Sequence, residues 1–231
     1  MNGKSFAIAV AWVLAAPGAA AHEYWIEKGD GGYTLFQGHV FSTHEGEARV
    51  PYDPAIVKRV LCAGGASASP SAGKSYPVKV DAKCAAILID VVSGYWTQTL
   101  LDTVPKPRNE VFGALRGWKS EESIKRLDGW NAAAMKPLSD GLEIVPLENP
   151  FLLKPGDKLR VQVLWQGKPR KGVAVAYAGD TRGATDSQGE VNLRIRRGGV
   201  QMVAASFDEP IKDPLADRIV HGAILQFELP R

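Results

Sequence analysis

Short runs of alternating apolar and polar residues, separated by turn signals, constrain the fold of this chain more than any other feature. Residues 158–165 alternate cleanly, residues 166–169 form a turn, and residues 173–177 are the next such run. Side chains of a strand point alternately to its two faces, so these runs predict strands with one buried face. Further strands are predicted at residues 23–27, 33–42, 56–62, 76–80, 85–92, 95–101, 191–195, 201–207 and 220–229. Together they predict a mainly β protein of antiparallel, immunoglobulin-like sandwich type.

Residues 120–135 depart from this pattern and predict one short helical insertion. Ser120 fits an N-cap, and Glu121 and Glu122 follow in the first turn, where they meet the positive end of the helix dipole. Apolar residues then recur at helical spacing, namely Ile124, Leu127, Trp130 and Ala134. Pro137 ends the segment. We expect this helix to cover the sandwich with its apolar stripe.

A proline-rich stretch divides the chain. Residues 142–155 carry three prolines and lead into the strands of the second half, which is typical of a linker. We therefore predict two tandem sandwich units, residues 22–145 and residues 146–231, with the helical insertion in the first unit.

The first 21 residues have the features of a cleaved signal peptide. Lys4 is their only charge, residues 6–16 form an apolar run too short to span a bilayer comfortably, and small residues lead up to Ala21. Cleavage after Ala21 makes His22 the first residue of the mature protein, and an uncleaved membrane anchor is the alternative. We predict a periplasmic protein whose mature chain does not span the membrane, because no second apolar run approaches membrane-spanning length.

The charge of the chain argues against nucleic acid as a partner. The formal net charge is +3, and it falls to +2 when Lys4 leaves with the signal peptide. Basic residues do not gather into a continuous patch, so the electrostatic footprint of a nucleic-acid-binding protein is missing.

The two cysteines, Cys62 and Cys84, predict a disulfide. Both lie in the mature chain, and an exported protein experiences an oxidising compartment. A bridge of this loop length stabilises a fold by roughly 3 kcal/mol. The alternative is a pair of thiolate metal ligands, which the absence of CxxC spacing disfavours.

Three of the four histidines, His22, His39 and His44, lie in one segment directly after the predicted cleavage site. A mature N-terminal His22 offers its free α-amine and its imidazole to one metal ion as a chelate. His39 follows Gly38, where a β-bulge can re-aim a side chain, and His44 lies beyond the predicted strand end. Nitrogen ligands of this kind suit nickel, cobalt, copper and zinc, so we predict a divalent transition-metal site here.

Other residues are candidates for supporting this site. His221 begins the last predicted strand and supplies a fourth nitrogen if that strand passes near the first. Glu45 and Glu23 are candidates for orienting the imidazoles and balancing charge. Each histidine also has a simpler reading: His22 merely follows the cleavage site, His39 is half-buried and bonded to backbone, and His44 is a solvated loop residue.

Three parts of the sequence resemble one known family. They are LEIVPLENPFLLKPGDKLRVQVLWQGKPRKGVAVAYA, AHEYWIE after the signal peptide, and the glycine-histidine segment GHVF. The resemblance is to bacterial periplasmic proteins with a domain of unknown function, the periplasmic component of nickel/cobalt uptake systems. GKPRKGVAV and ATDSQGEVNL also resemble a transthyretin-like or collagen-adhesin B-type sandwich. The resemblance implies an exported, sandwich-folded protein, and a membrane metal transporter as its partner.

Three functions follow from these observations. The first is a periplasmic protein that binds nickel or cobalt and hands it to an uptake system. The second is a copper histidine-brace oxidase, since those enzymes also begin with a mature His on an immunoglobulin-like sandwich. The third is a metal-free binding or adhesion module. Metal content separates the third from the others, and oxidase activity with ascorbate and oxygen separates the second from the first.

Overall fold

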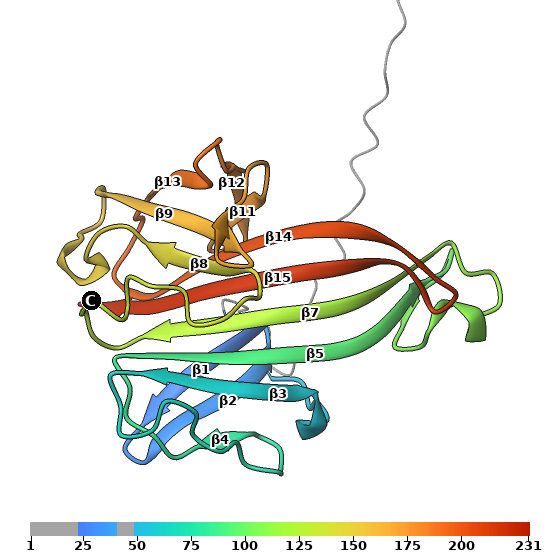
Figure 1. The fold of residues 1–231 in the computed structure, drawn as a ribbon, viewed down its shortest axis with the longest axis horizontal. Coiled ribbons are helices and arrows are strands. Elements are labelled where there is room, and N and C mark those ends of the chain that lie inside the picture. Colours follow the sequence, from blue (N-terminus) through green and yellow to red (C-terminus); the bar gives the residue numbers. More distant parts are fainter. Residues whose placement is uncertain (1–22, 41–48) are drawn as a thin grey trace, which may run out of the picture.

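The computed structural model describes residues 23–40 and 49–231 and arranges them in three β-sheets (Figure 1). The prediction of a mainly β protein is confirmed. Within these ranges there is no α-helix, and the helical segments are three single 3-10 turns, η1 (Pro54–Ile56), η2 (Arg108–Glu110) and η3 (Pro150–Leu152). No helix among the described residues is long and apolar enough to cross a membrane.

An eight-stranded sheet forms the middle layer. Its strands follow the order β12-β11-β14-β15-β7-β5-β3, and β6 pairs with β5. All neighbours are antiparallel except β15 and β7, which run parallel with Arg218 beside Trp118 and Gln226 beside Arg126. The bounds are β3 Val57–Ala63, β5 Ala86–Gln98, β6 Thr103–Val104, β7 Arg116–Leu127, β11 Ala174–Tyr177, β12 Asp180–Ala184, β14 Gly199–Asp213 and β15 Ala216–Leu229.

Two smaller sheets cover the two faces of this layer. One contains β1 (Glu23–Gly29), β2 (Gly32–Gly38) and β4 (Lys79–Val80); the other contains β8 (Glu143–Pro146), β9 (Lys158–Trp165), β10 (Lys168–Pro169) and β13 (Glu190–Arg194). Successive side chains of a strand point to opposite faces, so β15 contributes to both cores. Ile224 packs in the cluster under β1 and β2, whereas Leu225 packs in the cluster under β8 and β9.

The predicted helix at residues 120–135 is wrong, because its whole first half, residues 120–127, lies in strand β7. β7 lies between β5 and β15 and hydrogen-bonds to both. Its charged residues Lys125 and Arg126 are buried and have partners. Lys125 is 1% exposed and its Nζ lies 2.7 Å from Glu143 Oε1. Tertiary pairing therefore overrides the local helical pattern.

The stretch at residues 142–155, predicted as a linker, is also part of the folded core. Strand β8 is buried along its whole length and pairs with β9. The division into two tandem units stays a prediction, and strands from both sides of residue 145 share the eight-stranded sheet.

Candidate functional site

The β1–β2 hairpin brings together two residues of the predicted metal site. Its antiparallel register places Glu23 opposite Gly38, so His39 follows directly after the partner of Glu23. Gly38 has a φ of +145°, a conformation that L side chains rarely adopt, and it ends the strand at that point. Burial raises the pKa of the Glu23 carboxyl, and the charge of nearby His39 opposes that rise. Glu23 and His39 are therefore electrostatic neighbours.

Strand β1 is held on the middle sheet by polar contacts to one backbone residue, Ile26. The Ile26 N–H donates to Gln226 Oε1 at 2.9 Å, and the Ile26 carbonyl accepts from Gln226 Nε2 at 2.9 Å and from an Arg126 nitrogen at 3.1 Å. The Gln226 amide thus acts as a substitute for a neighbouring strand. These bonds fix the position of β1, and with it the position of Glu23, three residues away.

Glu122 lies on β7, on the face of the middle sheet that β1 and β2 cover, and close to Tyr24 near the start of β1. Glu122 pairs in register with Gly222 of β15. A Cβ atom at position 222 would lie only 3.0 Å from Glu122 Cγ, so the glycine leaves room for the glutamate side chain. Burial raises its pKa to about 7, and a hydrogen bond from Ser120 Oγ partly opposes this. Burial and the neighbouring Glu122 and Tyr52 also raise the pKa of Tyr24. Glu122 of β7 therefore lies close to Tyr24, the residue that follows Glu23 in β1.

The remaining predicted ligands fall in two groups. His22, His44 and Glu45 lie outside the described residues. His221 is described, but the structure does not bring it to His39. His221 packs against Trp165 of β9, with ring centroids 4.2 Å apart, on the face of the middle sheet opposite the β1–β2 hairpin.

His221 lies among aromatic rings and carboxylates. It is 3% exposed, its ring centroid is 4.9 Å from that of Phe207, and its nitrogens lie 3.8 Å from Glu121 and 3.6 Å from Glu209. Burial lowers its pKa, and the two carboxylates oppose this. The carboxylates approach opposite nitrogens of the ring, Nδ1 and Nε2, so they do not converge on a single point beside it.

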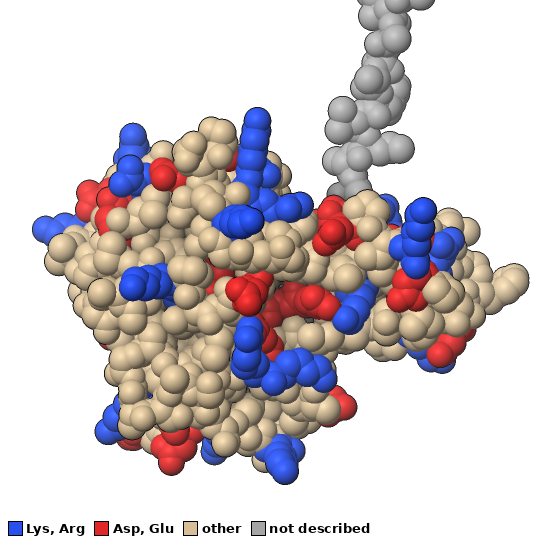
Figure 2. Space-filling model, viewed as in Figure 1, with Lys and Arg blue, Asp and Glu red and all other residues tan. Residues whose placement is uncertain are grey.

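A cleft of about 500 Å³ opens beside His221. Its lining includes Asp90, Glu121 and Asp140 as well as Lys58 and Arg59, and acidic side chains gather in a hollow with basic ones beside them (Figure 2). Part of this charge is already paired. The Asp90 carboxylate accepts from Arg59 at 2.7 Å and from Ser123 at 2.9 Å. The cleft is thus a mixed-charge surface rather than a cluster of free acids.

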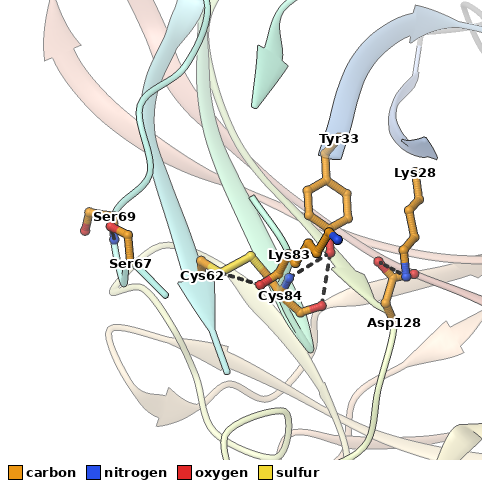
Figure 3. Close-up of a disulfide and its surroundings, with 8 residues drawn as sticks. All are labelled: Lys28, Tyr33, Cys62, Ser67, Ser69, Lys83, Cys84 and Asp128. Atoms are coloured by element: carbon orange, nitrogen blue, oxygen red, sulfur yellow. Dashed lines mark hydrogen bonds and ion pairs between the residues drawn. A yellow bond between two sulfur atoms is a disulfide. The ribbon is translucent and has the colours of Figure 1, made fainter. Parts of the chain in front are cut away.

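The predicted disulfide between Cys62 and Cys84 is confirmed, with Cα atoms 5.5 Å apart. It joins β3 to the segment before β5, and Figure 3 shows Tyr33 of β2 closing over it. The Tyr33 hydroxyl donates to the Cys84 carbonyl at 3.0 Å and accepts from the Cys84 N–H at 3.2 Å. The cysteines are therefore structural, and the thiolate-ligand alternative does not apply.

Across residues 23–40 and 49–231, no three His, Cys, Asp or Glu side chains lie close enough together to hold a metal ion. The described chain thus offers two neighbouring groups at the hairpin end, Glu23 and His39, and a complete site there needs further ligands. Reasoning from the sequence missed Glu122. Its assignment to a helix gave no reason to place it beside β1.

Comparison with known proteins gives one match. The family described as Domain of unknown function (DUF4198) matches residues 19–209, which is most of the chain. No curated protein and no solved structure matches.

Proposed function

We propose that this chain, which belongs to the DUF4198 family, is an exported periplasmic protein that binds one divalent transition-metal ion, nickel or cobalt, for delivery to a membrane uptake system. The ligands in this proposal are the α-amine and imidazole of His22 and the imidazoles of His39 and His44. Copper and zinc are the competing ions, because they accept the same nitrogen donors.

One observation carries the proposal: the β1–β2 hairpin puts Glu23 and His39 side by side at its open end. Glu23 is also the residue that directly follows His22 in the chain. Glu23 thus lies beside His39 in the fold and next to His22 in the sequence, and this supports the pairing of the two histidines in the proposal.

The carboxylates near this end fit the charge of such a site. An amine and imidazoles are neutral donors, so they leave the charge of a divalent ion uncompensated. Glu23 lies beside His39, and Glu122 of β7 lies close to Tyr24 of β1. Carboxylates close to imidazole ligands orient them and raise their basicity. Each nitrogen must lose its proton before it binds, so we expect affinity to fall as the pH drops through about 6.5.

Titration calorimetry of the mature protein with nickel, cobalt, copper and zinc tests the proposal. One variant inserts an alanine between Ala21 and His22, with cleavage still after Ala21, which keeps every imidazole but moves the free amine off His22. A second is His39→Ala. We expect the insertion to remove most of the affinity and His39→Ala to weaken it. His221→Gln is the matched control, because it removes a histidine on the other face of the middle sheet and should bind as wild type.

Each outcome has a distinct meaning. Unchanged binding in both variants contradicts the assignment of ligands, and a wild-type protein that binds none of the four ions favours the metal-free binding module. Turnover of ascorbate and oxygen by the copper-loaded protein favours the histidine-brace oxidase. Mass-spectrometric determination of the mature N-terminus checks that His22 carries the free amine.

A further inference from the structure

The long strands of the middle sheet extend beyond both smaller sheets and form an arm (Figure 1). Its end contains the β5–β6 turn, the loop from η2 to β7 and the β14–β15 turn. Backbone bonds tie these segments together. The Leu115 N–H donates to the Gln98 carbonyl at 2.8 Å, and the Arg108 N–H donates to the Leu215 carbonyl at 2.8 Å. An ion pair between Arg108 and Asp217 adds to this connection.

Four large apolar side chains are exposed at the end of this arm. They are Leu100, Leu101, Phe112 and Leu115, and 86%, 97%, 102% and 57% of each is exposed. We call these four residues the apolar tip. Scattered exposed leucines are ordinary, but several on adjoining loops of one projecting end mark an interaction surface.

The turn that presents Leu100 and Leu101 is fixed, and its polar backbone is internally bonded. The Thr99 hydroxyl accepts from the N–H groups of Leu101 and Asp102, at 3.2 and 3.1 Å. The Thr99 N–H donates to the Asp102 carbonyl at 2.8 Å. Glycine, proline, asparagine, aspartate and serine dominate such turns, so two leucines at its apex are unusual. The apex therefore presents apolar side chains while three of its N–H groups are already satisfied.

We propose that the apolar tip inserts into the interfacial layer of a lipid bilayer and anchors the protein reversibly on a membrane surface. Hydrocarbon accepts only backbone whose polar groups are bonded internally, and the Thr99 turn meets that condition for these N–H groups. Insertion into lipid does not require a partner surface of complementary shape. Apolar side chains on separate loops at a projecting end can therefore insert together. The shape of the arm lets this end reach a flat surface.

The charge beside the apolar tip is compatible with this occupant and adds little to binding. Residues 99–116 contain three basic residues, Lys106, Arg108 and Arg116, and two acidic ones, Asp102 and Glu110. Lys106 and Arg116 form no ion pair with any described residue, so they can face anionic headgroups. We therefore expect binding that rests mainly on apolar insertion. It should increase modestly with anionic lipid and persist at high salt, as for an amphipathic surface anchor.

Sedimentation of the full mature protein with vesicles tests this inference. One set of vesicles contains phosphatidylethanolamine and phosphatidylglycerol, and another contains phosphatidylcholine alone. We expect wild type to sediment with both, and Leu101→Asp and Phe112→Asp each to lower the bound fraction about tenfold, because each replaces an inserted apolar group by a charge. Leu152→Asp is the matched control. Leu152 is 75% exposed in η3, far from the apolar tip in the fold, and its variant should bind as wild type.

The variants change highly exposed positions, so the fold should survive, and the circular dichroism spectrum verifies this. The inference is overturned if wild type does not sediment with either set of vesicles. It is also overturned if the tip variants bind as wild type does, or if Leu152→Asp loses binding to the same extent. Concentration-dependent dimers that Leu101→Asp disrupts, without vesicle binding, would assign the apolar tip to a second copy of the chain instead. None of these outcomes depends on metal binding.

Discussion

At the scale of single residues, the half-buried Glu122 is an acid whose ionisation the fold opposes. Its pKa rises from an ordinary value of 4.5 to about 7 through burial. The folded state therefore holds a proton on Glu122 at pH values where the unfolded chain has released it. Ionising Glu122 costs stability, and the cost grows as the pH rises from about 4.5 to about 7.

We predict that Glu122→Gln removes this cost while keeping a side chain of the same shape. At pH 8 the variant should be more stable than wild type by about 1–3 kcal/mol. The difference should shrink to near zero by about pH 4.5, where Glu122 is protonated in both states. Urea unfolding across this pH range measures it. Glu110→Gln, in η2 at the end of the arm, serves as the control, and parallel pH profiles for Glu122→Gln and wild type would contradict the prediction.

Individual residues of β7 also explain why the sequence predicted a helix at residues 120–135. Lys125 and Arg126 lie within the predicted helix, yet they are in strand β7 and are 1% and 6% exposed. Lys125 pairs with Glu143, 18 residues away, and Arg126 donates to the Ile26 carbonyl, 100 residues away, as well as to nearby Asp128. The local pattern does not reveal the distant partners, so it does not distinguish a strand with buried charges from an exposed helix. The error also concealed Glu122.

At the scale of secondary-structure elements, strands with a clean alternation were predictable and interrupted ones were less so. β9 has the predicted bounds, and β1 and β2 both form, although β2 ends at Gly38 rather than at residue 42. β5 is one strand where the sequence predicted two, because it continues through a bulge between Val92 and Gly94. The nearness of Glu23 and His39 follows from the pairing of β1 with β2, two strands that were predicted. Its attachment to the middle sheet depends on Gln226, 200 residues away, and could not be foreseen.

We predict that Gln226→Ala loosens β1. The change leaves the buried Ile26 N–H without its partner, and such a loss costs about 1–3 kcal/mol. The Ile26 carbonyl keeps its bond from Arg126, so β1 should stay attached but open more often. Urea unfolding gives the stability change, and amide hydrogen exchange at Ile26 should become faster in the variant.

A second glutamine-to-alanine variant, at Gln162, is the control for this prediction. Gln162 donates to the Gln188 carbonyl near the surface, and Gln162→Ala should change stability much less. Equal exchange at Ile26 in wild type and Gln226→Ala would show that β1 does not depend on this amide.

At the scale of the whole molecule, the disulfide is the covalent link between two parts of the fold. It closes a loop whose ends are 22 residues apart and supports the face on which β1 and β2 pack. We predict that the double change Cys62→Ala and Cys84→Ala lowers the free energy of unfolding by about 3 kcal/mol, mainly because the unfolded chain regains freedom. Guanidinium unfolding of the oxidised protein, the reduced protein and the variant measures this. Identical midpoints in all three would contradict it.

The parallel pairing of β15 with β7 has a consequence for the order of folding. Partners in this pair are 100 residues apart, as Arg218 and Trp118 are, and β15 lies between β14 and β7. A chain that emerges from its N-terminal end completes β7 long before it has the β14–β15 hairpin, whose second strand lies between β14 and β7. The middle layer therefore closes last, around its own final strand, and such long-range closure folds slowly. A polypeptide ordered in this way cannot complete the middle layer until β15 has emerged, and this delay is compatible with the export before folding that we propose.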